Sequence, residues 1–248
     1  MPASQRGFGL VELMVGITVG MIVAAGASIV AVNQINEHRR LMLETQVQQD
    51  LRAAADLLQQ DLRRAGFRGD AEKGVWAPPA VVGTLKEQAA SVATPNNYTD
   101  FQVQDDGAER SLRYSYARVD PDTGSFSPAG VPQDAEHFGF KWDKGEEKLS
   151  LQLGLKSDGS PNWQPITDPQ SVKITDFDFT VTSQSTTDMG DFCEKACGTG
   201  GAPACPVHTV RRVHFRMVAQ AAHDTKVKRT LEGDERLRAD VVTGTCPS

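Results

Sequence analysis

The chain has 248 residues, of which 39% are hydrophobic and 23% charged, with 22 glycines and 13 prolines. These proportions are ordinary for a folded protein and exclude collagen-like, intrinsically disordered and multi-span membrane proteins. Its 26 basic side chains stand against 32 acidic ones, which gives a formal net charge of −6. Because nucleic-acid binding draws on many phosphate contacts from lysine and arginine, we expect no nucleic acid among the partners of this acidic chain.

The first predicted element is an apolar helix near the amino terminus. The segment Leu13–Val32 carries no charged side chain. At a rise of about 1.5 Å per residue, a helix of this length crosses the roughly 30 Å hydrocarbon core of a bilayer. It is too long for the apolar region of a secretory signal peptide, and no small-residue cleavage site follows it directly. We therefore expect one membrane-spanning helix over residues 8–32.

One acidic residue, Glu12, lies at the start of this apolar segment. A carboxylate near the end of a membrane helix costs free energy unless it finds a partner, and such residues are usually functional. If the chain is cut between Gly7 and Phe8, the new α-ammonium group of Phe8 lies one helical turn from Glu12. The two charges can then pair within one chain or between neighbouring subunits, which penalises a subunit packed out of register. In the alternative, the helix is uncut and Glu12 reaches the lipid headgroups.

These residues resemble the class III signal peptide of type IV prepilins and type II secretion pseudopilins. The matching positions are the basic leader residue, the glycine before the cut, and the first and fifth mature residues: Arg6, Gly7, Phe8 and Glu12. The resemblance implies that a membrane prepilin peptidase removes the leader, residues 1–7, and methylates the amino group of Phe8. Gly9 stands where the family often has serine or threonine, which alters none of these roles.

The helical pattern continues beyond the apolar segment. Apolar side chains recur at steps of three and four residues: Val47, Leu51, Ala54, Leu58 and Leu62. Such a stripe is typical of a helix with one buried face. We therefore predict one helix from about Phe8 to Ala65, amphipathic over residues 33–66, which buries the stripe against a sheet. Gly66 and Gly69 are the expected stop signals.

The end of this helix resembles that of one group within this family. The sequence Asp61-Leu62-Arg63-Arg64-Ala65-Gly66-Phe67-Arg68-Gly69 is similar to the D-L-R-x-A-G-F-x-G ending of PilW-type minor pilins. The resemblance implies a type IV pilus subunit that helps prime pilus assembly, with the pilus tip as its expected place. The implied partners are other minor pilins, the major pilin, prepilin peptidase and the inner-membrane assembly machinery. The implied location is the inner membrane, with a periplasmic carboxyl-terminal domain, and the pilus after assembly.

Residues 67–248 are predicted to form the periplasmic domain. Short runs of alternating apolar residues, separated by turn signals, indicate an antiparallel sheet with one buried face. The runs are Leu112/Tyr114/Tyr116, Phe138/Phe140/Trp142, Leu149/Leu151/Leu153/Leu155, Phe177/Phe179/Val181 and Val213/Phe215/Met217. A long helix packed on such a sheet is an α+β fold, and the resemblance makes it type IV pilin-like. Residues 76–100 are expected to be a loop-rich connector.

All four cysteines lie near the carboxyl end: Cys193, Cys197, Cys205 and Cys246. In an oxidising periplasm, an even number of cysteines favours disulfides. Three pairings are possible, and we expect Cys246 to bond one of the upstream three. The alternative is a zinc site formed by Cys193, Cys197, Cys205 and His208, although its spacing lacks the paired CxxC of zinc fingers.

No catalytic signature occurs in the sequence. The five histidines are scattered, with neither a G-x-S-x-G nor an H-E-x-x-H motif, and disulfide formation disfavours a cysteine nucleophile with His208 or His214. We therefore expect no enzymatic activity, no cofactor and no resident metal. The predicted function is that of a minor pilin. The alternatives are a type II secretion pseudopilin of the GspJ type and an uncut, membrane-anchored periplasmic binding module.

Overall fold

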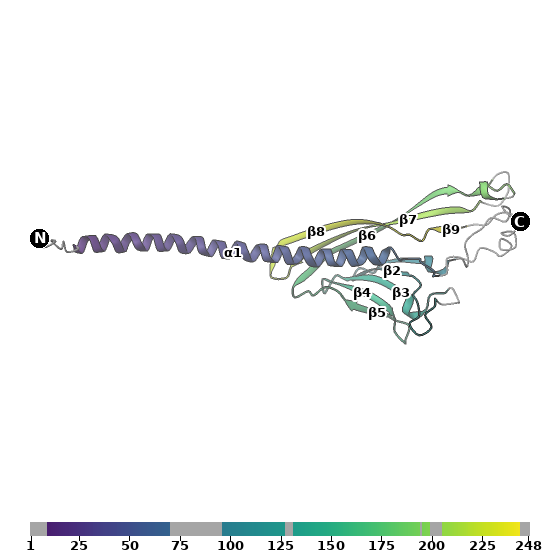
Figure 1. Cartoon of the computed structure of the whole chain (residues 1–248), viewed down its shortest axis with the longest axis horizontal. Helices are drawn as coiled ribbons and strands as arrows, with labels where there is room; N and C mark the ends of the chain where they lie inside the picture. Colours follow the sequence, from purple (N-terminus) through teal and green to yellow (C-terminus); the bar gives the residue numbers. More distant parts are fainter. Residues whose placement is uncertain (1–8, 70–95, 127–130, 194, 199–204, 244–248) are drawn as a thin grey trace. The chain divides into compact units, whose positions relative to one another are not determined.

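The computed structural model describes residues 9–69, 96–126, 131–193, 195–198 and 205–243. The chain divides into two compact units, Met1–Gln46 and Val47–Ser248. The helix α1 (Leu10–Leu62) begins in the first unit and ends in the second (Figure 1). No proline interrupts it, and its ends lie close to the predicted ones. Most of the predicted connector, residues 76–95, lies outside the described residues, and its last part carries the short 3-10 helix η1 (Asn97–Thr99).

The second part of α1 supplies one layer of the core of unit Val47–Ser248. Every residue of the predicted apolar stripe is at most 5% exposed: Val47, Leu51, Ala54, Leu58 and Leu62. Full burial of each larger side chain contributes about 1.5–3 kcal/mol to folding. Tertiary packing of this stripe therefore stabilises the helix in the second unit more than intrinsic helix propensity does.

The first sheet contains five antiparallel strands that pair in chain order. Its strands are β1 (Phe101–Asp105), β2 (Glu109–Ser115), β3 (His137–Asp143), β4 (Lys148–Leu155) and β5 (Pro161–Pro165), and the 3-10 helix η2 (Asp134–Glu136) precedes β3. The register places Leu112 opposite Phe140 and Phe140 opposite Leu151. Because directly paired residues of antiparallel strands point to the same face, these apolar side chains line one side of the sheet.

The second sheet is built on three long strands. They are β6 (Val172–Asp188), β7 (Val207–Ala221) and β8 (Asp224–Arg236), joined by the short β9 (Val241–Thr243), with the 3-10 helix η3 (Gly190–Phe192) after β6. β7 pairs with β6 on one side and with β8 and then β9 on the other. The core face of this second sheet carries five buried side chains from β6 and β7: Phe177, Phe179, Val213, Phe215 and Met217.

The fold class is confirmed as a long helix packed on antiparallel sheet, but the strands form two sheets rather than one. The indole Nε1–H of Trp142 in β3 donates to the carbonyl of Ile174 in β6 at 2.8 Å and joins the two sheets. The end of α1 lies beside both sheets (Figure 1). Asp61 of the helix bonds Tyr114 of β2, and Arg63, the residue after the helix, pairs with Glu235 of β8 at 3.1 Å. Alternation predicts each strand separately and does not reveal how the strands divide between sheets.

The predicted burial along β4 holds only for the first part of the strand. Leu149 is fully buried, but Leu153 is 50% exposed while the polar Gln152 is 1% exposed. The register with β5 shifts between Gln152 and Leu155, and Gly154 has φ of +84°, a conformation that glycine adopts without strain. This irregularity ends the alternation that the four leucines predict.

Candidate functional site

The amino-terminal end of α1 is organised around Glu12. Its Oε2 accepts a hydrogen bond from the backbone N–H of Gly9 at 3.2 Å. Gly9 precedes the first helical residue, so Glu12 is the third residue of the helix and closes half of a capping box. The positive end of the helix dipole also favours a carboxylate at this position. Glu12 therefore has a local capping role that the sequence analysis did not identify, although a Glu at the third helical position is a known capping signal.

Gly7 and Phe8 lie outside the described residues. The neighbouring Gly9 is therefore the reference point for the predicted cleavage site. The Phe8 nitrogen is one residue upstream of the Gly9 nitrogen that the Glu12 carboxylate binds. One extended residue spans at most about 3.6 Å. A cut before Phe8 would therefore create an ammonium group within one residue's reach of the atom that Glu12 already contacts.

The apolar part of α1 presents its side chains outward. By length and composition, the helix is long and apolar enough to cross a membrane, and this part of it is not buried. Leu10, for example, is 75% exposed. The hydroxyl groups of Thr18 and Ser28 donate to carbonyls one turn earlier, those of Met14 and Ala24. Because these hydroxyls are satisfied within the helix, they impose no unpaired donor on an apolar surrounding.

Asp61 attaches the other end of α1 to the first sheet. Its Oδ2 accepts a hydrogen bond from the hydroxyl of Tyr114 at 2.5 Å, and its Oδ1 accepts one from the hydroxyl of Tyr116 at 2.8 Å. Hydrogen bonds to a charged acceptor are stronger than those between neutral groups. Burial, together with the negative charge of Asp61, raises the pKa of Tyr114 well above its usual value, and the same causes raise the pKa of Tyr116.

The residues after Asp61 turn the chain out of the helix and onto the sheet. Gly66 and Gly69 have φ of +82° and +81°, which is consistent with their role as predicted stop signals. The Gly66 N–H donates to the carbonyl of Ser115 at 2.8 Å, and the Ala117 N–H donates to that of Phe67 at 2.6 Å. A Cβ on Gly66 would lie 2.6 Å from the Cβ of Ala239, and one on Gly69 would overlap Phe126. The motif that ends the helix therefore fixes its junction with the sheet.

The cysteines form disulfides rather than a zinc site. Cys197 and Cys205 are bonded to each other, and Cys193 is also disulfide-bonded. Thiolates are the zinc ligands, so the Cys197–Cys205 bond removes two of the four suggested ligands, and His208 Nε2 lies 3.0 Å from Oδ2 of Asp240 instead. Among the described residues, no three His, Cys, Asp or Glu side chains are grouped as a metal site. Cys246 lies outside the described residues, and its predicted bond stays a prediction.

The chain combines two features: an exposed apolar helix with a charged residue at its start, and an α+β unit that packs on the second part of this helix. Together they define a pilin-like protein. Comparison with known families agrees with this class. Residues 40–237 match the family described as prepilin peptidase-dependent protein B, and residues 2–28 match the prokaryotic N-terminal methylation motif. The chain therefore belongs to the prepilin peptidase-dependent protein B family. No curated protein and no solved structure shows a significant match to it.

This family assignment gives the chain a pilin-like or pseudopilin-like role that depends on prepilin peptidase. The methylation motif and the apolar helix together fit a membrane-anchored protein. Pilin-like families are structural, so membership suggests a subunit rather than an enzyme.

Proposed function

We propose that this chain is a minor pilin of a type IV pilus, of the PilW type, which helps prime pilus assembly and resides at the pilus tip. The observation that carries the proposal is a methylation motif over residues 2–28 at the start of a helix whose apolar side chains are exposed. Such a surface needs either lipid or other apolar helices around it. A pilin meets both requirements in turn, first in the membrane and then in the filament.

The proposed processing divides the chain into functional parts. Residues 1–7 are a leader that prepilin peptidase removes after Gly7, and Phe8 becomes the N-methylated first residue. Residues 8–32 anchor the protein once in the inner membrane, residues 33–66 continue the helix, and residues 67–248 form the periplasmic domain. The hydroxyls of Thr18 and Ser28 support the anchor role, because both donate to carbonyls of the helix itself and need no partner from the lipid.

Assembly then exchanges one apolar environment for another. When the apolar part of α1 leaves lipid and packs against helices of other pilins, it gives up little hydrophobic stabilisation, since lipid tails and side chains are similarly apolar. Other minor pilins, the major pilin and the inner-membrane assembly machinery are the proposed partners. The pilus is the proposed location after assembly.

Glu12 is proposed to fix the register of the subunit during this exchange. In the described chain its carboxylate binds the Gly9 N–H, next to the nitrogen that cleavage would charge. A carboxylate and an ammonium group buried together offset each other's desolvation, whereas either one alone does not. A subunit shifted along the filament would leave Glu12 without a cationic partner, whether its own or a neighbour's.

Glu12 variants test this role. We expect Glu12→Ala to lower the amount of chain in sheared filaments about tenfold or more, because loss of one partner of a buried charge pair costs several kcal/mol. Glu12→Asp keeps the charge and is expected to retain part of the incorporation. Equal incorporation of all three proteins, at equal membrane abundance, would refute the register role.

The alternative of a GspJ-type pseudopilin shares the signal and the helix, so deletion phenotypes separate the two functions. A minor pilin is expected to appear in sheared surface filaments at low stoichiometry, and its deletion is expected to abolish or sharply reduce surface pili and twitching. A pseudopilin deletion would instead block secretion of folded exoproteins and leave the pili intact. The latter result would overturn the assignment to a pilus.

A further inference from the structure

A groove lies where the chain leaves α1 and meets the first sheet, and we name it the helix-end groove. Its volume is about 340 Å³, near the lower end of the roughly 300–1,000 Å³ range of ligand sites. Phe67, from the motif that ends the helix, forms part of its wall. The lining comes from the residues just after α1 and from the segment after β2, and it includes Arg64, Phe67, Tyr116, Arg118, Val119 and Phe126.

The apolar wall of the helix-end groove is partly open to solvent and held in place. Phe67 is 45% exposed and Val119 is 51% exposed. The rings of Phe67 and Phe126 pack edge to face with their centroids 5.7 Å apart, and the carbonyl of Phe67 accepts a hydrogen bond from the Ala117 N–H at 2.6 Å. Covering such a surface with an apolar group is favourable, because it removes the surface from water. The wall is therefore preformed for an apolar side chain.

Two arginines border this wall. Arg64 and Arg118 are both exposed, and in the described part of the chain neither forms an ion pair with a carboxylate. Arg63, next to Arg64, shows the contrast, because it pairs with Glu235 at 3.1 Å. The groove thus joins an apolar wall to two positive charges that no acidic side chain of the described chain takes up.

Contacts within the chain hold both arginine side chains at the groove. Cζ of Arg118 lies 5.8 Å from the ring centroid of Phe138, within cation–π range. The side chain of Arg64 lies beside the hydroxyl of Tyr116. That hydroxyl donates to Asp61 at 2.8 Å, so the carboxylate near Arg64 binds a tyrosine instead of the arginine. Side chains held in this way lose less conformational entropy when they bind a ligand.

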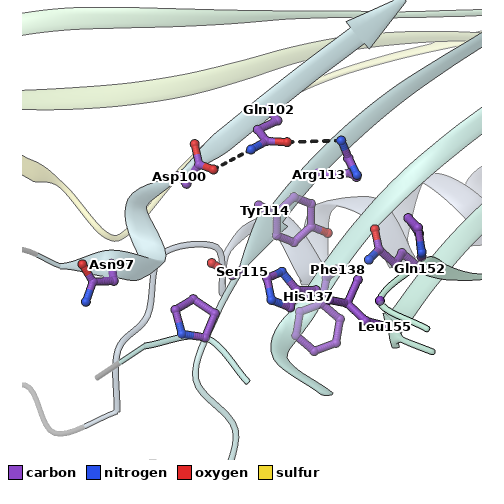
Figure 2. Close-up of a pocket in the computed structure, with 13 residues that line it drawn as sticks. Asn97, Asp100, Gln102, Arg113, Tyr114, Ser115, His137, Phe138, Gln152 and Leu155 are labelled. Atoms are coloured by element: carbon purple, nitrogen blue, oxygen red, sulfur yellow. Dashed lines mark hydrogen bonds between the residues drawn. The ribbon is translucent and has the colours of Figure 1, made fainter. Parts of the chain in front are cut away.

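The polar cavity of the first sheet is built differently. Its volume is about 310 Å³, and its arginine, Arg113, donates to Gln102 at 3.2 Å (Figure 2). Gln102 in turn donates to the carboxylate of Asp100 at 2.7 Å (Figure 2). An acidic residue therefore accompanies the arginine in that cavity. Among the described residues that line the helix-end groove, none is acidic, which makes this groove the better site for an anion.

We propose that the helix-end groove binds the carboxyl terminus of a partner protein whose last residue is apolar. A terminal residue carries a carboxylate and a side chain on the same Cα, so both groups enter the groove together. The carboxylate accepts charge-assisted hydrogen bonds from Arg64 and Arg118, and the side chain covers Phe67 and Val119. An internal acidic residue would bring peptide groups on both of its sides against the apolar wall, where they lack partners.

Matched peptides test the proposal by ligand-observed saturation-transfer NMR on the full chain in lauryldimethylamine oxide, with the signal of the micelles alone subtracted. The probe is N-acetyl-Gly-Ser-Gly-Leu with a free carboxyl group. Its carboxamide removes the charge, and N-acetyl-Gly-Leu-Glu-Gly carboxamide moves the charge inside the peptide. We expect transfer to the leucine methyl groups of the probe and at least fivefold less to either control. Equal transfer to a control, or none to the probe because another part of this chain fills the groove, overturns the proposal.

Matched arginine variants locate the binding. Arg118→Gln removes one cation and is expected to weaken binding of the probe about tenfold, which corresponds to roughly 1.4 kcal/mol. Arg212→Gln alters an exposed arginine of β7 outside the groove lining and should bind as the unmodified chain does. Because both positions are exposed, the unfolding midpoint should stay unchanged in both variants. Equal binding by all three proteins would contradict the site.

The partner's apolar residue has its own test. Val119→Asn replaces an exposed apolar side chain of the wall with a polar one and is expected to weaken binding of the probe, again without a change in the unfolding midpoint. Unchanged binding would show that the wall does not contact the ligand. Because no filament takes part in these assays, their outcome does not depend on the proposed minor pilin function.

Discussion

The carboxylate of Asp61, near the end of α1, accepts a hydrogen bond from the hydroxyl of Tyr114 at 2.5 Å and so ties the helix to the first sheet. Tyr116 donates to the other carboxylate oxygen. Asp61 follows the buried Leu58 by three residues and lies beside the buried Leu62. The end of the apolar stripe and this polar anchor therefore act on the same turn of the helix, within the second unit.

We predict that Asp61→Ala destabilises the protein by about 3–6 kcal/mol, because hydrogen bonds to a charged group contribute about 1.5–3 kcal/mol each and the hydroxyls of Tyr114 and Tyr116 would both lose their acceptor. Chemical unfolding of the full chain in detergent, followed by circular dichroism, measures the change. Asp56→Ala, at an exposed position of the same helix, is the control and should change the free energy of unfolding by less than about 0.5 kcal/mol. Equal losses for both variants would refute the anchor.

Alkaline pH should weaken the same anchor. The pKa of Tyr114 is raised in the folded state by burial and by Asp61, whereas an unfolded tyrosine titrates near pH 10. The stabilisation is therefore fully present below about pH 10 and is lost as pH rises from there toward the folded pKa. We expect the free energy of unfolding to fall above pH 10 more steeply in the unmodified protein than in Tyr114→Phe. Parallel pH profiles would contradict this prediction.

Leu58→Ala should destabilise the second unit by about 2–5 kcal/mol, the usual cost of truncating a fully buried leucine. Leu58 is 0% exposed, whereas Leu41 of the same helix is 55% exposed and belongs to the first unit. Leu41→Ala is therefore the matched control and should leave the denaturant midpoint of the second unit unchanged. A similar midpoint shift in both variants would contradict the claim that burial of the apolar stripe, rather than any leucine of the helix, stabilises the second unit.

The cysteine pairing can be read from peptides cleaved without reduction. We predict a Cys197–Cys205 linkage. Cys193 is bonded as well, and since the chain holds four cysteines, Cys246 is the partner predicted for it. Mass spectrometry should find both linked peptides and lose them on reduction. A Cys193–Cys197 or Cys193–Cys205 linkage in the purified protein would contradict the prediction.

Local patterns in the sequence predicted the helix and its buried face well. The stripe from Val47 to Leu62 and the glycines at 66 and 69 behave as expected, because helical periodicity and left-handed termination are local properties. The core-facing aromatic residues of the strands could be predicted equally well from the sequence, because the alternation of apolar and polar residues indicates which face of a strand is buried.

The division into two sheets and the partners of Asp61 could not be predicted in the same way. Asp61 and Tyr114 are far apart in the sequence, and their contact depends on how α1 packs on β2. The burial of Gln152 likewise depends on the register shift between β4 and β5 and on the positive φ of Gly154. These features arise from long-range pairing, which no single-strand pattern contains.

The central claim is that prepilin peptidase cuts the chain between Gly7 and Phe8 and methylates the new terminus. The most direct test is the mass of the amino-terminal peptide of the membrane-extracted protein from peptidase-competent cells, with cells lacking the peptidase as the control. The account predicts a peptide that begins at Phe8 and carries one extra methyl group, replaced by a peptide that retains the leader in the control cells. A peptide that retains residues 1–7 in the competent cells would contradict it.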